Sequence, residues 1–339
     1  MAITMREVAR VAGVSIKTVS NVVNDYPHIR PDTRRRVMQS IEELGYQPNL
    51  SARGLRSGRT GAISLIIPDL KNAYFAELAD AVMTAASRVG HAVMIEQSGG
   101  DRERELEILH GPRMRMVDGV LYSVLGLGQE DTALIDISTP VVLLGERIFN
   151  GPTDHVTMKN VEASQAATEH LISLGRRRLL AFGAHRDEVI GSAGLRLEGY
   201  RRALHEAGLP YLEELTVDVQ QWHRGDGAEA MRAVLDEGIR FDGIVAFNDS
   251  IALGAMRILQ EAGIAIPEDV ALIGFDDIDE TRYSLPTLST IDPGRPEIAE
   301  TAVRMLLERI QSHGTDIPPR EFEAAFRLIE RESTALPHL

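Results

Sequence analysis

The chain contains no cysteine and only one tryptophan among its 339 residues. Without cysteine, disulfide bonds, thiolate catalysis, iron–sulfur clusters and cysteine-based zinc sites are excluded, and nothing indicates an oxidising compartment. Apolar runs are no longer than a strand, and the start MAITMREVAR has no apolar core typical of signal peptides. These absences predict a cytoplasmic protein without a membrane partner. The length and the 44% hydrophobic content predict two or three domains with buried cores.

Motifs of common enzyme classes are absent as well. The segment Gly126-Leu127-Gly128 lacks the third glycine of a dinucleotide fingerprint, and neither a phosphate-binding G-x-x-x-x-G-K-[ST] nor a nucleophile elbow G-x-S-x-G occurs. The ten histidines form no H-E-x-x-H motif, which argues against a bound metal. We therefore expect neither catalysis nor a cofactor.

Charge is distributed unevenly along the chain. The whole sequence carries a formal charge of −14, which by itself argues against nucleic acid as a partner. Residues 1–60, however, hold ten basic and five acidic side chains, a net charge of +5, so residues 61–339 carry −19. This asymmetry indicates a small polyanion-binding module attached to an acidic body.

The first module has the pattern of a helix-turn-helix. The T-M-R-E sequence at residues 4–7 has the form of a capping box, which predicts a helix that starts there and ends before Gly13. Ser15 then caps a second helix over residues 16–23, whose N-terminal end would enter the DNA major groove. A third helix over residues 31–44 begins with proline and stops before a glycine.

Residues 47–60, QPNLSARGLRSGRT, form a hinge between the module and the body. A turn and a half of helix from Asn49 to Arg56 is marginal in water, so we expect it to order only on docking to DNA or to a second copy of the chain. Gly54 lowers the helix propensity further, by about 1 kcal/mol relative to Ala. The hinge can therefore act as a switch.

The segments MREVARVAGVSIKTVSNVVN and LGYQPNLSARGLRSGRT closely resemble the DNA-binding headpiece and hinge of the lac-repressor (LacI/GalR) family of bacterial transcription regulators. By that resemblance Ile16, Lys17 and Asn21 read base edges, Lys17 at guanine and Asn21 at adenine or guanine. Leu55 matches the hinge leucine that is wedged between base pairs from the minor groove, which kinks the duplex. The other positions of the predicted DNA-binding set are Ser15, Thr18 and Ser20, which contact phosphate or support the helix, and Thr4, Asn49, Ala52 and Arg56.

From residue 61 onward, apolar strand-like runs alternate with helical stretches. Because the apolarity within each run is continuous rather than alternating, we expect strands buried on both faces and hence parallel α/β sheets. The predicted strands are Ala62–Ile67, Val93–Ile95, Gly119–Ser123, Val141–Leu144, Leu179–Phe182, Gly243–Phe247 and Val270–Phe275.

The resemblance extends over nearly the whole chain and supplies the arrangement of these strands. It implies a periplasmic-binding-protein-like sensor of two doubly wound parallel-sheet subdomains, joined by three crossovers. The predicted domains are a helix-turn-helix domain (1–46), the hinge (47–60) and an effector-binding and dimerisation domain (61–339), with an N-subdomain over about 61–160 and 291–322 and a C-subdomain over about 161–290 and 323–339.

Polar residues stand at the carboxyl ends of the predicted strands, where open α/β sheets bind ligands. Asp276 follows a buried strand, where it could accept hydrogen bonds from sugar hydroxyls or cap the next helix. By the family pattern we expect Asp276 to bind the effector and Asp277 to be structural. Asn248 is an N-cap, a ligand contact or both. By the resemblance, Arg196 clamps the effector with its planar guanidinium and Trp222 stacks on the effector ring.

The opposite wall of the predicted cleft departs from the family pattern. Tyr74 and Phe75 match effector-contacting positions there, although they could simply pack on the helix they precede; Ser192 completes the effector-binding set. Glu146 stands one position beyond the Asp that the family often has, and Lys159 replaces another Asp. These departures put the common pattern of sugar-hydroxyl contacts in doubt at this wall.

The sequence as a whole predicts a homodimeric, ligand-responsive repressor of transcription that binds double-stranded operator DNA of two-fold symmetry. A small molecule, a sugar or a derivative of one, would bind between the subdomains and control the hinge. The end of the chain lacks a leucine heptad, which predicts a dimer rather than a tetramer. The alternatives are a sugar-binding transport receptor, for which residues 1–60 have no use, a sugar- or nucleoside-converting enzyme, and a regulator that uses a corepressor or a protein partner.

Overall fold

The computed structural model divides the chain into two compact units, with the boundary after Gly61. The predicted hinge residues Asn49, Ala52, Leu55 and Arg56 lie outside the part of the chain that the structure describes. The described residues are 3–23, 26–46, 59–312 and 317–335.

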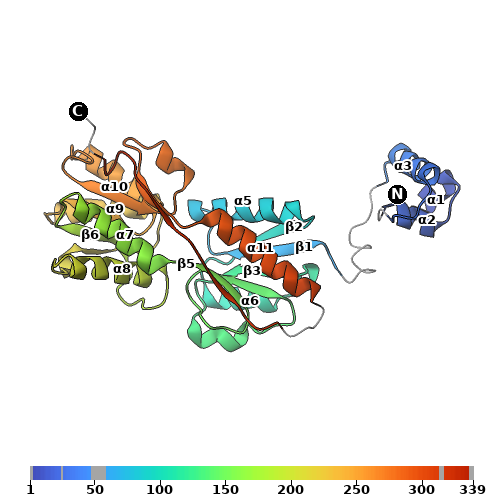
Figure 1. The fold of residues 1–339 in the computed structure, drawn as a ribbon, viewed down its shortest axis with the longest axis horizontal. Coiled ribbons are helices and arrows are strands. Elements are labelled where there is room, and N and C mark those ends of the chain that lie inside the picture. Colours follow the sequence, from blue (N-terminus) through green and yellow to red (C-terminus); the bar gives the residue numbers. More distant parts are fainter. Residues whose placement is uncertain (1–2, 24–25, 47–58, 313–316, 336–339) are drawn as a thin grey trace. The chain divides into compact units, whose positions relative to one another are not determined.

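The first unit consists, in its described residues, of helices α1 (Met5–Ala12), α2 (Ile16–Val23) and α3 (Pro31–Leu44) (Figure 1). The capping box of α1 is present, because the Thr4 hydroxyl accepts a hydrogen bond from the Glu7 amide and the Glu7 carboxylate accepts one from the Thr4 amide. Gly13 ends α1 with a φ of 64°, a conformation that favours glycine. The small core of this unit is built from Val8, Ala9, Ala12, Val19, Val22, Val37 and Tyr46.

The second unit contains, within its described residues, two six-stranded sheets (Figure 1). The first has the order β11-β5-β4-β3-β1-β2 and is parallel throughout. Its strands are β1 (Ala62–Ile67), β2 (Ala92–Gln97), β3 (Val120–Ser123), β4 (Val141–Leu144), β5 (Asp154–Met158) and β11 (Glu321–Ala324). The second has the order β12-β10-β9-β8-β6-β7, and only its edge strand β12 is antiparallel. Its strands are β6 (Leu179–Ala184), β7 (Thr216–Asp218), β8 (Gly243–Ala246), β9 (Ala271–Phe275), β10 (Ser289–Asp292) and β12 (Arg327–Ile329).

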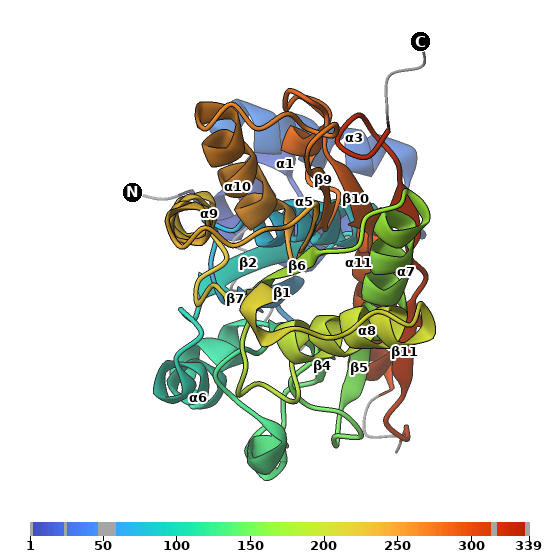
Figure 2. The same cartoon turned by 90° about the vertical axis from the view of Figure 1, so that its left-hand side faces the viewer.

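Helices cover both faces of the second sheet: Figure 2 shows α7 and α8 on one side of it and α9 and α10 on the other. The alternation along β6 explains this, because Leu179 and Ala181 join one apolar cluster while Leu180 and Phe182 join another. The helices of the unit are α5 (Ala73–Arg88), α6 (Arg102–His110), α7 (Asn160–Ser173), α8 (Ser192–Glu206), α9 (Arg224–Asp236), α10 (Asp249–Glu261) and α11 (Arg295–Gln311). None of the helices in the described ranges is long and apolar enough to cross a membrane.

The chain passes between the two sheets three times: between β5 and α7, between β10 and α11, and between β11 and β12. The boundaries expected at 290/291 and 322/323 fall inside β10 and β11. Because backbone pairing continues to Asp292 in β10 and to Ala324 in β11, these crossovers begin after those residues.

The prediction of an α/β fold is confirmed, and each of the seven predicted strands has a counterpart in the structure. Strand β2 differs in its burial, and five strands of the described residues were not predicted: β5, β7, β10, β11 and β12. Strand β2 is apolar, yet it lies at the sheet edge, where Met94 and Ile95 are exposed by 41% and 39%. Strand β5 was not predicted because its sequence DHVTM is largely polar, although all five residues are buried. Its aspartate, Asp154, is fully buried because Arg309 and Arg320 supply it with hydrogen bonds.

Candidate functional site

A cavity of about 560 Å³ opens between the two halves of the second unit, well within the size range of small-molecule sites. Its walls come from the carboxyl ends of strands in both sheets, the place where open α/β sheets bind ligands. The cavity lining includes the predicted effector residues Tyr74, Phe75, Ser192, Arg196, Trp222 and Asp276.

Arg196 is the central cation of this cavity and is only 3% exposed. Its Nε donates to Asn160 Oδ1 over 2.8 Å and its Nη1 donates to the carbonyl oxygen of Phe247. The guanidinium lies 3.5 Å from the ring centroid of Phe275, and burial lowers its pKa. Its Nη2 donates to Met158 Sδ over 3.5 Å and lies 3.9 Å from a carboxylate oxygen of Asp276, and the side chain is part of the cavity lining.

Asp276 follows β9 directly, as the sequence suggested, and occupies a turn with unusual backbone geometry. Its φ is 121° and that of Asp277 is 48°, both in the left-handed region that disfavours residues other than glycine. The residue is 4% exposed, and burial raises the pKa of its carboxyl well above the ordinary value. A buried carboxyl beside Arg196 suits the pairwise recognition of hydroxyl groups.

Aromatic side chains form two opposite walls of the cavity. Trp222 is held by its Nε1, which donates to the Gly183 carbonyl over 3.0 Å, and its ring lies 5.7 Å from that of His185. On the other wall, the rings of Tyr74 and Phe75 pack edge to face, 5.3 Å apart. Such amphipathic rings suit the apolar faces of a sugar.

Asn248 does not line the cavity. It is 1% exposed, its Oδ1 accepts from the Ile251 amide over 2.9 Å as the N-cap of α10, and its Nδ2 donates to the Trp222 carbonyl over 3.1 Å. Of the roles left open by the sequence, this geometry provides the cap, because both ends of the amide are already bonded. Asn248 therefore positions Trp222 indirectly, through its backbone.

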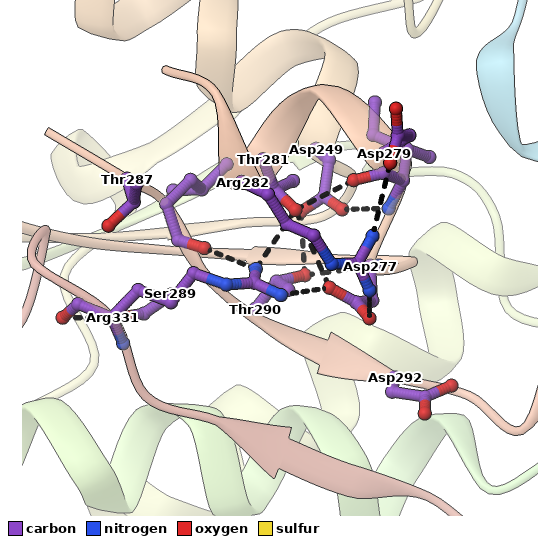
Figure 3. Close-up of polar contacts among 12 residues, drawn as sticks. Asp249, Asp277, Asp279, Thr281, Arg282, Thr287, Ser289, Thr290, Asp292 and Arg331 are labelled. Carbon is purple, nitrogen blue, oxygen red and sulfur yellow. Dashed lines mark hydrogen bonds and ion pairs between the residues drawn. The ribbon is translucent and has the colours of Figure 1, made fainter. Parts of the chain in front are cut away.

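Asp277 and Asp249 do not belong to the cavity lining and are joined through Thr290 in one polar network (Figure 3). The Asp277 carboxylate accepts from Arg331 Nη2 over 2.5 Å and from Arg282 Nη2 over 2.7 Å. Asp249 accepts from the Thr290 hydroxyl over 2.7 Å, and burial raises the pKa of its carboxyl. Both carboxylates are thus engaged in holding loops together.

Several charged side chains of the cavity escaped the sequence-based prediction. The imidazole of His223 donates to Asp69 over 2.6 Å and joins the two halves across the cavity. Glu146, noted only as a departure from the family pattern, accepts from the Ser192 hydroxyl over 2.6 Å and makes a second cross-cavity bond. Asp69 and Glu146 each follow a strand, so the strand-end rule could have indicated them, whereas nothing in the sequence pairs Asp69 with a histidine 154 residues away.

The surface of α2 carries the predicted DNA-reading residues. Ile16 is 41% exposed, and Ser15 and Lys17 are exposed beside it, at the N-terminal end of the helix. The Ser15 hydroxyl accepts from the Thr18 amide over 3.1 Å, which caps the helix. Asn21 is half-buried and Ser20 is buried, so the geometry favours a supporting role for Ser20.

Comparison with known proteins accounts for both units. The model of bacterial regulatory proteins of the lacI family matches residues 4–49, and that of a periplasmic binding protein-like domain matches residues 168–334. The HTH-type transcriptional regulator RegA of Clostridium saccharobutylicum is 33% identical over 98% of this chain and 100% of its own. The chain belongs to the LacI family.

Solved structures of LacI-family proteins share its fold. A LacI-family regulator of Sanguibacter keddieii is 52% identical over 82% of this chain and 99% of its own, with a TM-score of 0.76. The chain is also similar to the lac repressor dimer bound to operator and the anti-inducer ONPF, with 25% identity over 99% of this chain and 100% of that chain and a TM-score of 0.83. It is similar as well to the complex of the regulator CelR with cellobiose, with 28% identity over 98% of this chain and 99% of that chain and a TM-score of 0.72. This LacI-family protein is thus a ligand-controlled, DNA-binding regulator of transcription, and its relatives are transcriptional regulators. Within the described residues, no group of three or more potential metal ligands occurs.

Proposed function

We propose that the chain is a homodimeric, cytoplasmic repressor, without catalytic activity, whose affinity for operator DNA is set by an uncharged carbohydrate in the cavity. The observation that carries the proposal is the convergence of Arg196, Asp276 and Trp222 on one cavity between two aromatic walls. An arginine fork and a carboxyl can together bind neighbouring hydroxyls, and the rings can cover the apolar faces of a sugar.

An uncharged effector fits the electrostatics of the cavity. An anionic ligand would meet four acidic side chains in the cavity lining, against three side chains from lysine and arginine. The acidic side chains of the lining and their partners are Asp69 with His223, Glu146 with Ser192, Glu188 with His185 and Arg147, and Asp276 with Arg196.

The volume supports an effector larger than a monosaccharide. If each water takes about 30 Å³, the 560 Å³ cavity has room for about 19 waters. That number exceeds the heavy atoms of a hexose and approaches those of a disaccharide. The cellobiose in the CelR complex is a ligand of this class.

Exposed apolar side chains support the homodimer. Four of them lie on neighbouring elements, α5, the turn after it and the edge strand β2, where a monomer would leave them in water: Met83, Val89, Met94 and Ile95. Patches of this kind mark protein interfaces, and the lac repressor neighbour is a dimer. Light scattering at micromolar concentration should give the mass of a dimer, and a tetramer would contradict the proposal.

The sugar-binding part of the proposal is tested by thermal-shift assays against cellobiose, ribose and the anionic sugar gluconate. We expect cellobiose or another uncharged disaccharide to raise the melting temperature of the wild type, and gluconate to leave it unchanged. Arg196→Ala should abolish the shift. Arg201→Ala is the matched control on the same helix, because Arg201 stacks on Tyr211 at the surface. A shift that survives in Arg196→Ala would refute this site.

The DNA-binding part is tested by selecting operators from random duplexes and measuring their affinity at several salt concentrations. We expect a steep loss of affinity with salt despite the net charge of −14, because the +5 module contacts phosphate. Lys17→Ala should relax base preference, and Leu55→Ala should weaken specific binding with the headpiece still folded. Salt-insensitive binding, or unchanged operator affinity in Leu55→Ala, would contradict the assignment.

A further inference from the structure

The turn that carries Asp276 cannot hold its shape through local preference alone. Asp276 and Asp277 are consecutive residues with φ of 121° and 48°, and neither is a glycine. Such backbone persists only where surrounding groups fix it. From the second-sheet side, the Asp276 amide donates to the Ile291 carbonyl over 2.8 Å, and the Asp277 carboxylate is bound by Arg331 (Figure 3). The two carbonyl oxygens of the turn need a separate donor.

That donor is Arg295, the first residue of α11, which packs on α5 beside the first sheet. Its Nη1 donates to the Asp276 carbonyl over 2.7 Å and its Nη2 to the Asp277 carbonyl over 3.3 Å. Nη2 also binds the Glu77 carboxylate on α5, whose second oxygen accepts from the Asp279 amide over 2.8 Å. One guanidinium and one carboxylate thus join the turn to two helices on the other side of the crossover.

The Arg295 and Glu77 side chains are 14% and 27% exposed, so water competes little for these bonds. Glu77 lies one turn after Tyr74 at the start of α5, and the same helix carries the exposed Met83. A displacement of the Asp276 turn therefore reaches a helix that both lines the cavity and bears part of the exposed apolar patch.

We propose that Arg295 and Glu77 are positioning residues that couple the state of Asp276 to helix α5. The inference rests on the proposed function in that Asp276 is taken to meet the effector. Ligand occupancy changes the turn, Arg295 carries the change through its two carbonyl bonds, and Glu77 passes it to α5. A two-site coupling of this kind is reciprocal, so changes at α5 also alter the turn.

The coupling can be measured on the full chain without any ligand, by hydrogen–deuterium exchange of the peptide spanning residues 73–82. The perturbation is Asp276→Gly, because glycine adopts the positive φ freely and so alters the rigidity of the turn. In an otherwise wild-type chain, we expect it to change exchange in this peptide by about fivefold or more. In an Arg295→Ala background, the same change should fall below about twofold, the range of independent sites.

Two further variants separate coupling from loss of structure. Arg295→Lys keeps the charge but lacks the planar fork that reaches both carbonyls and Glu77, so it should reduce the effect of Asp276→Gly although the chain folds normally. Arg88→Ala is the matched control, because Arg88 joins α5 to α11 through Glu300 over 2.7 Å at the exposed far end. It should leave the effect of Asp276→Gly intact. Circular dichroism confirms folding of each variant.

Three outcomes would overturn the inference. The first is an α5 peptide that does not respond to Asp276→Gly, and the second is a full response that persists in Arg295→Ala and Arg295→Lys. The third is loss of the response in Arg88→Ala to the same extent. If Arg295→Ala fails to fold, the response of the α5 peptide to Asp276→Gly is measured in the Glu77→Gln and Arg295→Lys backgrounds instead. Since no sugar enters this experiment, failure of the carbohydrate proposal in the thermal-shift assay is distinguishable from failure of the coupling.

Discussion

Replacing the buried Asp154 by Asn should destabilise the second unit in a strongly pH-dependent manner. Asp154 on β5 is fully buried and accepts hydrogen bonds from Arg309 Nη2 over 2.7 Å and from Arg320 Nη2 over 2.8 Å. Burial acts to raise the pKa of this carboxyl, but the hydrogen bonds from the two arginines outweigh it and lower the pKa to about 2. The carboxylate thereby ties β5 to α11 and to the residue that precedes β11.

The pKa fixes the size of the effect. The ordinary value is 3.8, so the difference of about 1.8 corresponds to about 2.4 kcal/mol at 1.36 kcal/mol per unit. A pKa that is lowered in the folded state stabilises above the ordinary pKa, and this stabilisation is lost as pH falls through the folded value. The ionised Asp154 carboxylate should contribute about 2.4 kcal/mol to the free energy of unfolding at pH 7 and about 1.3 kcal/mol at pH 3. For Asp154→Asn these are lower bounds, because two arginines also lose an acceptor.

Urea unfolding measures the difference, with Trp222 as the probe because it is the single tryptophan and lies in the second unit. Protein concentration is held constant, since dissociation of a dimer would add to the measured stability. Glu300→Gln, which removes an exposed ion pair from the same helix α11, is the control and should cost less than about 1 kcal/mol. The difference in the free energy of unfolding between the wild type and Asp154→Asn should be smaller at pH 3 than at pH 7. An equal difference at the two pH values would refute the reasoning.

Three further predictions follow from local geometry. Thr4→Ala removes the capping box and should lower the stability of the first unit by about 1 kcal/mol, measured by calorimetry; an unchanged transition would contradict the role of the cap. Gly183→Ala places a Cβ on a residue with a φ of 109°, only 2.5 Å from Ile251 Cδ1. The free energy of unfolding of the second unit, measured with urea, should therefore fall by about 1–3 kcal/mol. An unchanged free energy would show that the backbone relaxes around the new methyl group. The hydrogen bond with Glu188 raises the pKa of His185, so its stabilisation is complete below the ordinary value of 6.5 and is lost as pH rises through the raised value. His185→Asn should therefore cost more stability at pH 6 than at pH 9, and equal costs would contradict the pairing.

Much of the fold could be predicted because it rests on short-range patterns. The capping box at Thr4, the glycine that ends α1 and the apolar runs that became β1, β4 and β9 are properties of neighbouring residues. The pattern failed where burial depends on distant partners. Strand β5 is polar in sequence and buried in the structure, because Arg309 and Arg320 satisfy Asp154.

The residues of the candidate site likewise fall into those that could be predicted from the sequence and those that depend on distant contacts. Six of the seven predicted effector residues line one cavity, because the carboxyl ends of the strands of both sheets, and the helices α5 and α8 that begin near them, meet there. Asn248 stands at such an end but turns into the cap of α10, and its direction depends on the packing of the following helix. The bond between His223 and Asp69 joins segments that no local pattern relates.

By itself, the sequence determined the basic reading module, the acidic α/β body and the residue types available to a ligand, because charge, caps and apolar periodicity are encoded within a few neighbouring positions. Only the tertiary structure decided which of those residues face the cavity and which ones hold them in place. The link from Asp276 through Arg295 to Glu77 exists because a crossover brings α11 and α5 against a turn of the other half. Contacts between such distant segments follow from the packing of the whole unit.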